Sequence, residues 1–205
     1  MADVRQQLAE ELLHAARVLH KAGCLPASDG NFSARLNNEH ILLTARGIEK
    51  RSMRQADFVE VRLSDPDPAG GSSEWGLHRA IYQTRSEVNC VLHVHAPGLT
   101  SFAAAHRVPS VELLAEAYMT VGKIALVPFV TPGTPDLGAR AVQESRDAMI
   151  YLLANHGAVA VGFSVMETLH RLERAEFLAR IEINAHTLGG PQPMKPEQLA
   201  ALPRA

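Results

Sequence analysis

The sequence has few cysteines, few aromatic residues and no excess of charge of either sign. Its 205 residues include 2 cysteines, 5% aromatic residues, and 20 lysines and arginines against 22 aspartates and glutamates, for a formal net charge of -2. Cys24 and Cys90 form no CxxC pair and no disulfide framework, as is usual in a reducing compartment. Because there is no positive excess, nucleic-acid binding through bulk charge is disfavoured, and any anion site must be local.

Long hydrophobic runs are also missing. The longest apolar stretch, 124–130, is far shorter than the roughly 20 residues that span a bilayer, and it contains Pro128. The first residues, MADVRQQLAEELL, are acidic and polar, whereas a signal peptide is basic and then apolar. We therefore expect a cytoplasmic protein that binds no membrane. A chain of about 200 residues can enclose one core, which predicts a single domain over 1–205 with a proline-rich tail at about 190–205.

Helical and strand patterns alternate irregularly along the chain. The apolar periodicity predicts helices over 3–22, from 74, over 135–147 and from 164, the last opened by the capping box Ser164 to Glu167. Alternating or short apolar runs predict a hairpin over 31–44 and strands at 58–63, 88–95, 124–130, 148–154 and 158–163. This order predicts a three-layer α/β/α architecture around a mostly antiparallel or mixed sheet.

Histidine, by contrast, is abundant, and the densest histidine pattern is Leu92-His93-Val94-His95. Residues two apart on a strand point to the same face, so both imidazoles can face one metal ion. Two ligands rarely suffice, and His156, between a buried strand and Gly157, is the candidate for the third. An isolated HxH pair fits two ordinary strand histidines equally well.

A second pattern lies at Gly71–Trp75. Ser72 and Ser73 precede a predicted helix start, where free backbone N–H groups and the helix dipole favour a phosphate or carboxylate. Glu74 follows, and a carboxylate beside a divalent ion can ligate the ion or act as a general base. Taken alone, the segment is better explained by a serine cap with a first-turn glutamate. His78, one helical turn later, is a lesser candidate for the same cleft.

Two turns form a third pattern. Gly30 with Asn31, and Arg46 with Gly47, each place a glycine where backbone N–H groups can approach an anion closely. Arg46 is a candidate clamp for that anion, while Asp29 has the ordinary role of capping a turn.

Six segments over 28–157 occur together in one known family: SDGNFSAR, LLTARG, SSEWGLH, VLHVHA, AEAYMTVGK and ANHG. The set resembles the class II aldolase and adducin head-domain family, and most closely its L-fuculose-phosphate aldolases. The resemblance implies a site for Zn2+, or for Mn2+ or Co2+, formed by His93, His95 and His156. It implies that Glu74 is the catalytic acid/base and can also touch the metal.

The resemblance also implies a phosphate site and a second catalytic residue. The positions that match the family's phosphate-binding residues are Gly30, Asn31, Gly47, Ser72 and Ser73. Arg46 stands where the fuculose aldolases have threonine, and we add it to that set as a change in the anion site. Tyr118 matches a tyrosine that reaches the site of a neighbouring subunit, within a fourfold homotetramer.

These parts predict a zinc-dependent class II aldolase, an aldehyde-lyase of carbohydrate metabolism. Retro-aldol cleavage of a phosphorylated sugar, a ketose 1-phosphate such as fuculose 1-phosphate, would pass through a metal-stabilised enediolate to dihydroxyacetone phosphate and an aldehyde. Two related activities remain as alternatives, pentulose-phosphate 4-epimerase and methylthioribulose-1-phosphate dehydratase. The epimerases have aspartate where Glu74 stands, and the dehydratases have alanine for one serine of SSEW, so this segment favours the aldolase.

Two interpretations of other classes also apply. A non-enzymatic adducin-like module keeps the fold and loses the metal ligands, so retention of the three histidines disfavours it here. A zinc hydrolase could use the same histidines with Glu74 as base, but it would release no carbon fragment from a ketose phosphate.

Overall fold

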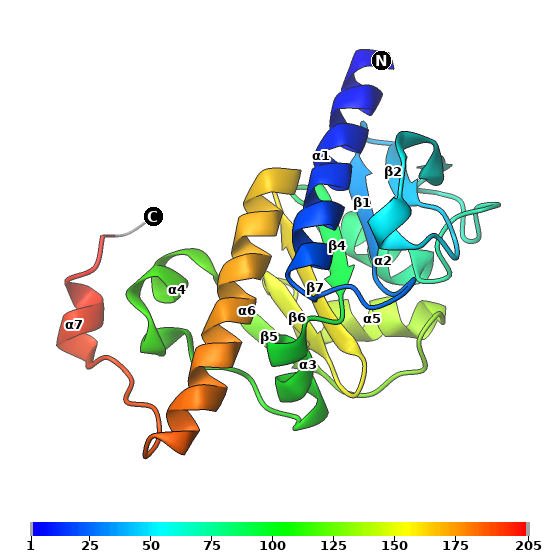
Figure 1. Ribbon diagram of the computed structural model, residues 1–205. Helices are drawn as coiled ribbons and strands as arrows, with labels where there is room; N and C mark the ends of the chain where they lie inside the picture. Colours follow the sequence, from blue (N-terminus) through cyan, green and yellow to red (C-terminus); the bar gives the residue numbers. More distant parts are fainter. Residues whose placement is uncertain (1, 204–205) are drawn as a thin grey trace.

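The computed structural model describes residues 2–203, in which a seven-stranded sheet lies between two layers of helices (Figure 1). The strands are β1 (Asn31–Arg35), β2 (His40–Thr44), β3 (Phe58–Arg62), β4 (Cys90–Val94), β5 (Ile124–Val127), β6 (Ile150–Leu153) and β7 (Gly157–Gly162). Their order in the sheet is β3-β2-β1-β4-β7-β6-β5, and every neighbouring pair is antiparallel except β5 and β6. The predicted three-layer fold with a mostly antiparallel sheet is confirmed.

The helices are α1 (Ala2–Lys21), α2 (Trp75–Thr84), α3 (Pro97–Ala104), α4 (Ala115–Thr120), α5 (Pro135–Glu144), α6 (Val165–Thr187) and α7 (Pro196–Ala200). Three 3-10 helices are η1 (Lys50–Ser52), η2 (Gln55–Asp57) and η3 (Val111–Leu113). None of the helices over 2–203 has the length and apolar composition needed to cross a bilayer.

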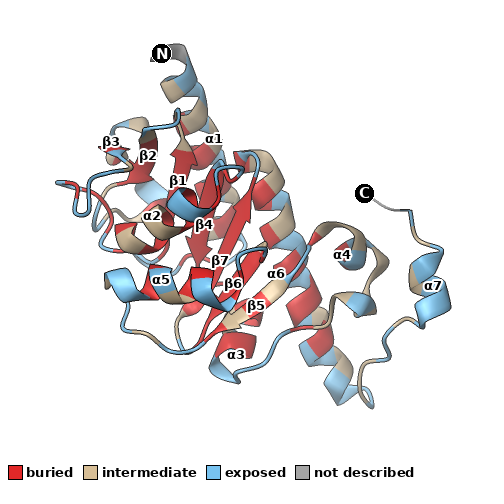
Figure 2. Ribbon diagram, turned by 180° about the vertical axis from the view of Figure 1, so that it is seen from behind, coloured by how far each residue is buried: buried red, intermediate tan, exposed pale blue. Residues whose placement is uncertain are grey.

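Each face of the sheet carries its own apolar core, because side chains alternate along a strand. Leu92 and Val94 of β4 pack with α1, α3 and α6 on one face, whereas Val91 packs with α2 and α5 on the other. Figure 2 shows buried residues along the strands and on the sides of the helices that meet them. His93 lies between Leu92 and Val94, so its ring is on the face of α2.

The central strands β1, β4 and β7 bring distant segments to one end of the sheet. Since both pairs are antiparallel, the beginning of β1 and the beginning of β7 lie beside the end of β4. The β1–β2 turn at 36–39, the beginning of β4 and the end of β7 lie at the opposite end. Residues far apart in sequence therefore meet where β4 ends.

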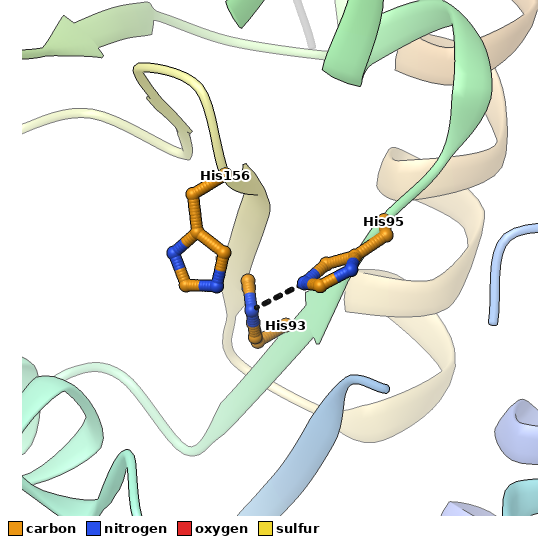
Figure 3. Close-up of side chains that lie close together, drawn as sticks. All are labelled: His93, His95 and His156. Atoms are coloured by element: carbon orange, nitrogen blue, oxygen red, sulfur yellow. Dashed lines mark hydrogen bonds between the residues drawn. The ribbon is translucent and has the colours of Figure 1, made fainter. Parts of the chain in front are cut away.

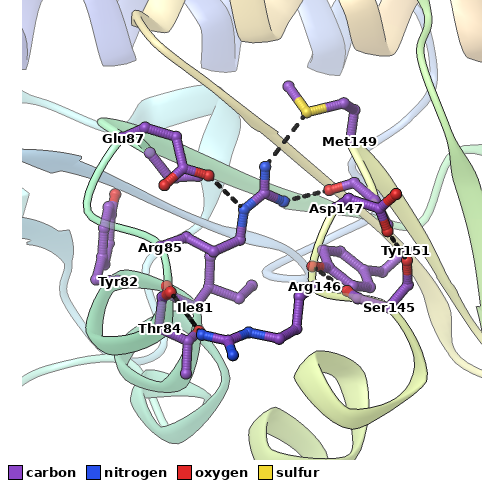
Figure 4. A network of polar contacts seen from close by, with 12 residues as sticks. Ile81, Tyr82, Thr84, Arg85, Glu87, Ser145, Arg146, Asp147, Met149 and Tyr151 are labelled. Atoms are coloured by element: carbon purple, nitrogen blue, oxygen red, sulfur yellow. Dashed lines mark hydrogen bonds and ion pairs between the residues drawn. The ribbon is translucent and has the colours of Figure 1, made fainter.

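The C-terminal end of α2 is anchored by a polar network (Figure 4). Arg85, which is buried, donates hydrogen bonds to the carbonyl oxygen of Ala148 and to the Met149 sulfur, and its Nε lies 2.8 Å from the Glu87 carboxylate. These contacts tie the end of α2 to the segment that enters β6. They fix the direction of the helix that begins next to Glu74.

The structure differs from the sequence-based expectations in a few element ends. The strand expected over 124–130 ends at Val127, because Pro128 has no N–H to donate to the sheet. The helix expected over 135–147 ends at Glu144. Helices α3 and α4 were not predicted, and the proline-rich tail contains the short helix α7.

Candidate metal centre

Three histidines meet where β4 ends (Figure 3). His93 is the fourth residue of β4 and is fully buried, and His95 follows the strand. His156 lies in the turn between β6 and β7, and β7 pairs with β4 so that His93 is opposite Val159. The structure thus brings together the three residues that the sequence nominated as metal ligands.

The three imidazoles surround one point. Their possible ligand atoms all lie within 4.8 Å of one another, and the Nε2 atoms of His93 and His95 are 3.3 Å apart. Two ligands of a tetrahedral zinc ion with bonds of 2.0–2.1 Å lie about 3.3 Å apart. The spacing of this pair therefore suits such an ion.

Hydrogen bonds on the far side of two rings determine which nitrogen faces that point. His93 Nδ1 lies 3.0 Å from the carbonyl oxygen of Ala158, and His95 Nδ1 lies 2.9 Å from Oδ2 of Asp29. Both partners are acceptors, so each Nδ1 carries the proton and each Nε2 presents a lone pair. Two facing lone pairs repel unless a cation lies between them, and the three histidines accordingly form a group consistent with a divalent metal ion.

Burial keeps two of the three histidines, His93 and His156, in the neutral form that metal binding requires. Burial lowers the pKa of His93 to about 4, against the opposing charge of Glu74. Burial likewise lowers the pKa of His156. Both imidazoles are uncharged at pH 7, so neither must lose a proton to bind a metal ion.

Gly157 leaves the space that the rings occupy. A Cβ at this position would lie 2.6 Å from the carbonyl oxygen of Val94 and 2.7 Å from the His95 ring, closer than real Cβ atoms approach. A side chain here would displace the imidazoles. The glycine after His156 is therefore a steric requirement of the three-histidine group.

Glu74 adjoins the three histidines from the N-cap position of α2. Its Oε2 lies 3.2 Å from His93 Nε2 and accepts a hydrogen bond of 2.7 Å from Asn31 Nδ2. Its Oε1 lies 3.4 Å from His156 Nε2, is buried, and accepts no hydrogen bond. Burial acts to raise the pKa of Glu74, but His93 and the hydrogen bond from Asn31 outweigh it, so the pKa lies below its usual range.

A cavity of about 450 Å³ opens beside these side chains. Its lining includes every residue of the predicted phosphate site, namely Gly30, Asn31, Arg46, Gly47, Ser72 and Ser73. Gly30 has φ of +77°, and a Cβ there would meet the carbonyl oxygen of His93 at 2.7 Å. Asn31 differs from the expectation in one respect, because its amide is engaged with Glu74 and His78 inside the protein.

Two charged residues that line the cavity, Lys50 and Asp29, were not predicted to bind a ligand or to act in catalysis. Lys50 is 3% exposed, and its Nζ donates to the carbonyl oxygens of Ser28 and Ile48 at 2.8 and 2.6 Å. Burial lowers the pKa of Lys50 to about 8, against the charge of Asp29. Asp29 itself, expected only to cap a turn, lies against His95. The position of Lys50 three residues after Gly47 is the one sequence signal that could have indicated it.

Two other candidates lie outside the cavity of their own chain. Tyr118, in α4, is 42% exposed and lines a separate surface pocket with Arg171 and Arg174. His78, weighed as a cleft residue, is fully buried and points into the protein, where it bonds Asn31 and Ser33.

Several known proteins are similar to this chain in fold and in sequence. The sequence over residues 10–183 matches the model of the class II aldolase and adducin N-terminal domain. A methylthioribulose-1-phosphate dehydratase of Sorangium cellulosum is 31% identical over 199 residues, which covers 83% of this chain and 89% of that protein. A 5-methylthioribulose-1-phosphate/5-deoxyribulose-1-phosphate aldolase of Escherichia coli O45:K1 is 31% identical over 182 residues, covering 87% and 84%.

A solved structure of an L-fuculose 1-phosphate aldolase superposes with a TM-score of 0.83 and 23% identity, over 98% of this chain and 95% of that one. At this identity the likeness concerns the fold. The family match extends from α1 to α6 and includes all three histidines and Glu74. The chain belongs to the class II aldolase and adducin N-terminal domain family.

Proposed function

We propose that the protein is a zinc-dependent lyase that removes water from a ketose 1-phosphate of the 5-methylthioribulose 1-phosphate type. One observation carries the proposal: the buried carboxylate of Glu74 lies against His93 and His156, two of the three histidines of the group, with Oε1 free of hydrogen bonds. The named dehydratase and aldolase relatives support the substrate class, because methylthioribulose 1-phosphate appears in both names.

The reaction needs a group that accepts a proton from carbon. In the dehydration, the proton on carbon 3, next to the carbonyl at carbon 2, is removed, and the hydroxyl on carbon 4 takes up a proton and leaves as water. Glu74 is placed to accept the carbon 3 proton at Oε1, since Oε2 is held by Asn31. A divalent ion bound by His93, His95 and His156 supplies a Lewis acid for the adjacent oxygens.

The phosphate would bind at the other end of the cavity. Backbone N–H groups at Gly30 and Gly47, the two serines, and the cations Arg46 and Lys50 line that end. Arg46 is largely exposed, with its guanidinium 4.0 Å from Asp67, so it can turn toward an anion. Binding the phosphate there holds carbon 3 near Glu74 and converts binding energy into orientation.

Retro-aldol cleavage of the same substrate is the second candidate. The paired serines before Glu74 and the similarity to the E. coli aldolase favour it. In that reaction the carbon 4 hydroxyl loses its proton, the bond between carbons 3 and 4 breaks, and carbon 3 gains a proton. Glu74 would donate that proton, so both reactions use the same residue at the same carbon.

Product analysis separates the two. The zinc-loaded protein is incubated with 5-methylthioribulose 1-phosphate, 5-deoxyribulose 1-phosphate and fuculose 1-phosphate, and products are followed by mass spectrometry and an assay for dihydroxyacetone phosphate. Dehydration yields a diketone that is lighter than the substrate by one water molecule, about 18 mass units. Release of dihydroxyacetone phosphate would instead establish the aldolase, and turnover of none of the three would refute the proposal.

Asp29 provides a prediction about the metal. The Asp29→Asn variant keeps the side-chain shape but loses the carboxylate that accepts the His95 Nδ1 proton. We expect the Kd for Zn2+ to rise about 10- to 100-fold, because such partners orient the ring and raise its basicity. Competition with a chromophoric chelator measures the Kd, with Asp65→Asn, an exposed aspartate outside the cavity, as control. An unchanged Kd would contradict the role of Asp29.

Tyr118 provides a prediction about assembly. Because Tyr118 is outside its own cavity, the proposal includes a homotetramer in which Tyr118 serves the site of a neighbouring subunit. Mixing inactive Glu74→Gln with inactive Tyr118→Phe, followed by subunit exchange, should restore about a quarter of the activity in an equimolar mixture, since some sites then combine two intact residues. Each variant mixed with itself is the control, and no recovery would contradict the role of Tyr118 in the site of a neighbouring subunit.

A further inference from the structure

A buried row of polar side chains runs from Glu74 into the protein, on the side away from the cavity. Asn31 Nδ2 is 2.7 Å from Glu74 Oε2, and Asn31 Oδ1 is 2.6 Å from His78 Nε2. His78 Nδ1 is 2.7 Å from Ser33 Oγ, which is 2.9 Å from Tyr82 Oη. All five residues are buried. We call the four hydrogen bonds the Glu74 chain.

Two elements position the Glu74 chain. Asn31 and Ser33 are alternate residues of β1, so their side chains leave the same face of the sheet. His78 and Tyr82 are one helical turn apart on α2, the helix that packs on that face. Each contact therefore crosses from strand to helix, between two elements whose packing places all five groups.

Only one assignment of donors and acceptors satisfies every hydrogen bond of the Glu74 chain. An ionised Glu74 only accepts, so the Asn31 nitrogen must face it and the Asn31 oxygen must face His78. His78 then donates from Nε2, and its Nδ1 accepts from the Ser33 hydroxyl, which in turn accepts from Tyr82. Burial lowers the pKa of His78 to about 3 and raises that of Tyr82, so the imidazole is neutral and the phenol keeps its proton.

The Glu74 chain gives the two carboxylate oxygens of Glu74 different surroundings. Oε2 is held by Asn31, whereas Oε1 is buried and has no hydrogen-bond partner. If the Asn31 amide rotated by 180°, its oxygen would face the carboxylate and repel it. His78 prevents that rotation, because its Nε2 proton needs the Asn31 oxygen.

We propose that His78 is a positioning residue for Glu74 and acts through Asn31. It fixes the amide so that Oε2 is held and Oε1, beside His156, stays free to exchange a proton. The inference rests on the proposed function in one respect, that Glu74 exchanges a proton with the substrate carbon.

Two variants of similar size test this role. His78→Leu removes the donor to Asn31, and His78→Gln retains one. We expect kcat of His78→Leu to fall about 10- to 100-fold, as for loss of a hydrogen bond in a chain that ends on a charge, and His78→Gln to recover most of it. KM and the Kd for Zn2+ should stay within about threefold, because neither substrate nor metal touches His78. Equal kcat values for the two variants, or a loss confined to KM, would overturn the proposal.

A measurement without substrate separates this inference from the proposed function. The 15N NMR spectrum of histidine-labelled protein distinguishes the ring tautomers, and His78 is assigned from its loss in His78→Gln. We expect a neutral ring protonated on Nε2 throughout pH 5–8. A ring protonated on Nδ1 would refute the proposed hydrogen bonds of His78, and with them its positioning role, even if the enzyme is active. If His78 has the expected tautomer but the protein turns over none of the sugar phosphates, only the proposed function is refuted.

Ser33→Ala keeps the inference testable if His78→Leu fails to fold. This small change removes the proton donor to His78 Nδ1 without touching Glu74 or the cavity. We expect kcat to fall about three- to tenfold with unchanged KM. The matched control is Ser145→Ala, a buried serine bonded to Asp147 outside the Glu74 chain. If the two serine variants have the same kcat, His78 does not depend on the chain and the proposal fails.

Discussion

Replacing Glu74 with glutamine is expected to lower kcat by about 10²- to 10⁴-fold, the usual contribution of a positioned acid or base. The amide oxygen can still accept the hydrogen bond from Asn31, so the side chain should keep its place, but neither of its polar atoms can take a proton from carbon. KM and zinc content should change little. Steady-state kinetics and elemental analysis of the purified variant measure these quantities.

Removal of the carbon 3 proton by Glu74 can be measured directly as exchange with solvent deuterium. In D2O the wild-type protein should exchange the carbon 3 proton of the substrate, and the Glu74→Gln variant should not. Glu173→Gln, which changes an exposed glutamate of α6, is the matched control and should behave as wild type. Retention of more than about a tenth of the wild-type kcat in Glu74→Gln would assign the base elsewhere.

The second large effect concerns the metal. His93→Ala removes the central ligand of the three, whose ring lies within 3.3 Å of the ligand nitrogen of His95 and within 3.2 Å of the Glu74 carboxylate. We expect the Kd for Zn2+ to rise at least about 10³-fold, since two histidines seldom hold zinc, and catalysis to fall to the background rate. Chelator competition and elemental analysis give the affinity and content.

Folding must be checked in the same variant. The cavity left by the imidazole should lower the free energy of unfolding by about 1–3 kcal/mol, which is too little to unfold the protein. The far-UV circular dichroism spectrum should therefore remain that of a folded α/β protein. His14→Ala, on the exposed side of α1, is the matched control and should bind zinc normally. Zinc retention after combined alanine substitution of His93, His95 and His156 would refute the metal centre altogether.

Local patterns were sufficient for the elements that bury one regular face. The period of α1 and α6 and the alternation of β1 and β2 predicted each of them to within about two residues at most ends. Helix α3 was missed, because its first N–H groups, at Gly98 and Leu99, are capped by the carboxylate of Glu176 in α6. A cap that lies 77 residues away leaves no signal in the local sequence.

The candidate site likewise contains residues that the sequence indicated and residues that it did not. His93 and His95 follow from the geometry of a single strand, and His156 from the end of another. The role of His78 could not follow from its position on α2, because it depends on the packing of that helix against β1. The parts played by Asp29 and Lys50 were missed for a similar reason: each contacts a partner that is distant in sequence, His95 at 66 residues from Asp29 and Ser28 at 22 residues from Lys50.

The antiparallel order of β1, β4 and β7 also determines where the chain tolerates insertion. The metal ligands and Glu74 occupy one end of these strands, whereas the exposed turn at 37–39, which joins β1 to β2, lies at the other end. A peptide tag or a fluorescent domain placed in that turn would extend into solvent and leave the imidazoles in register. One end of the sheet is thus open to protein engineering, while the other is closed even to the single methyl group of an alanine at Gly157.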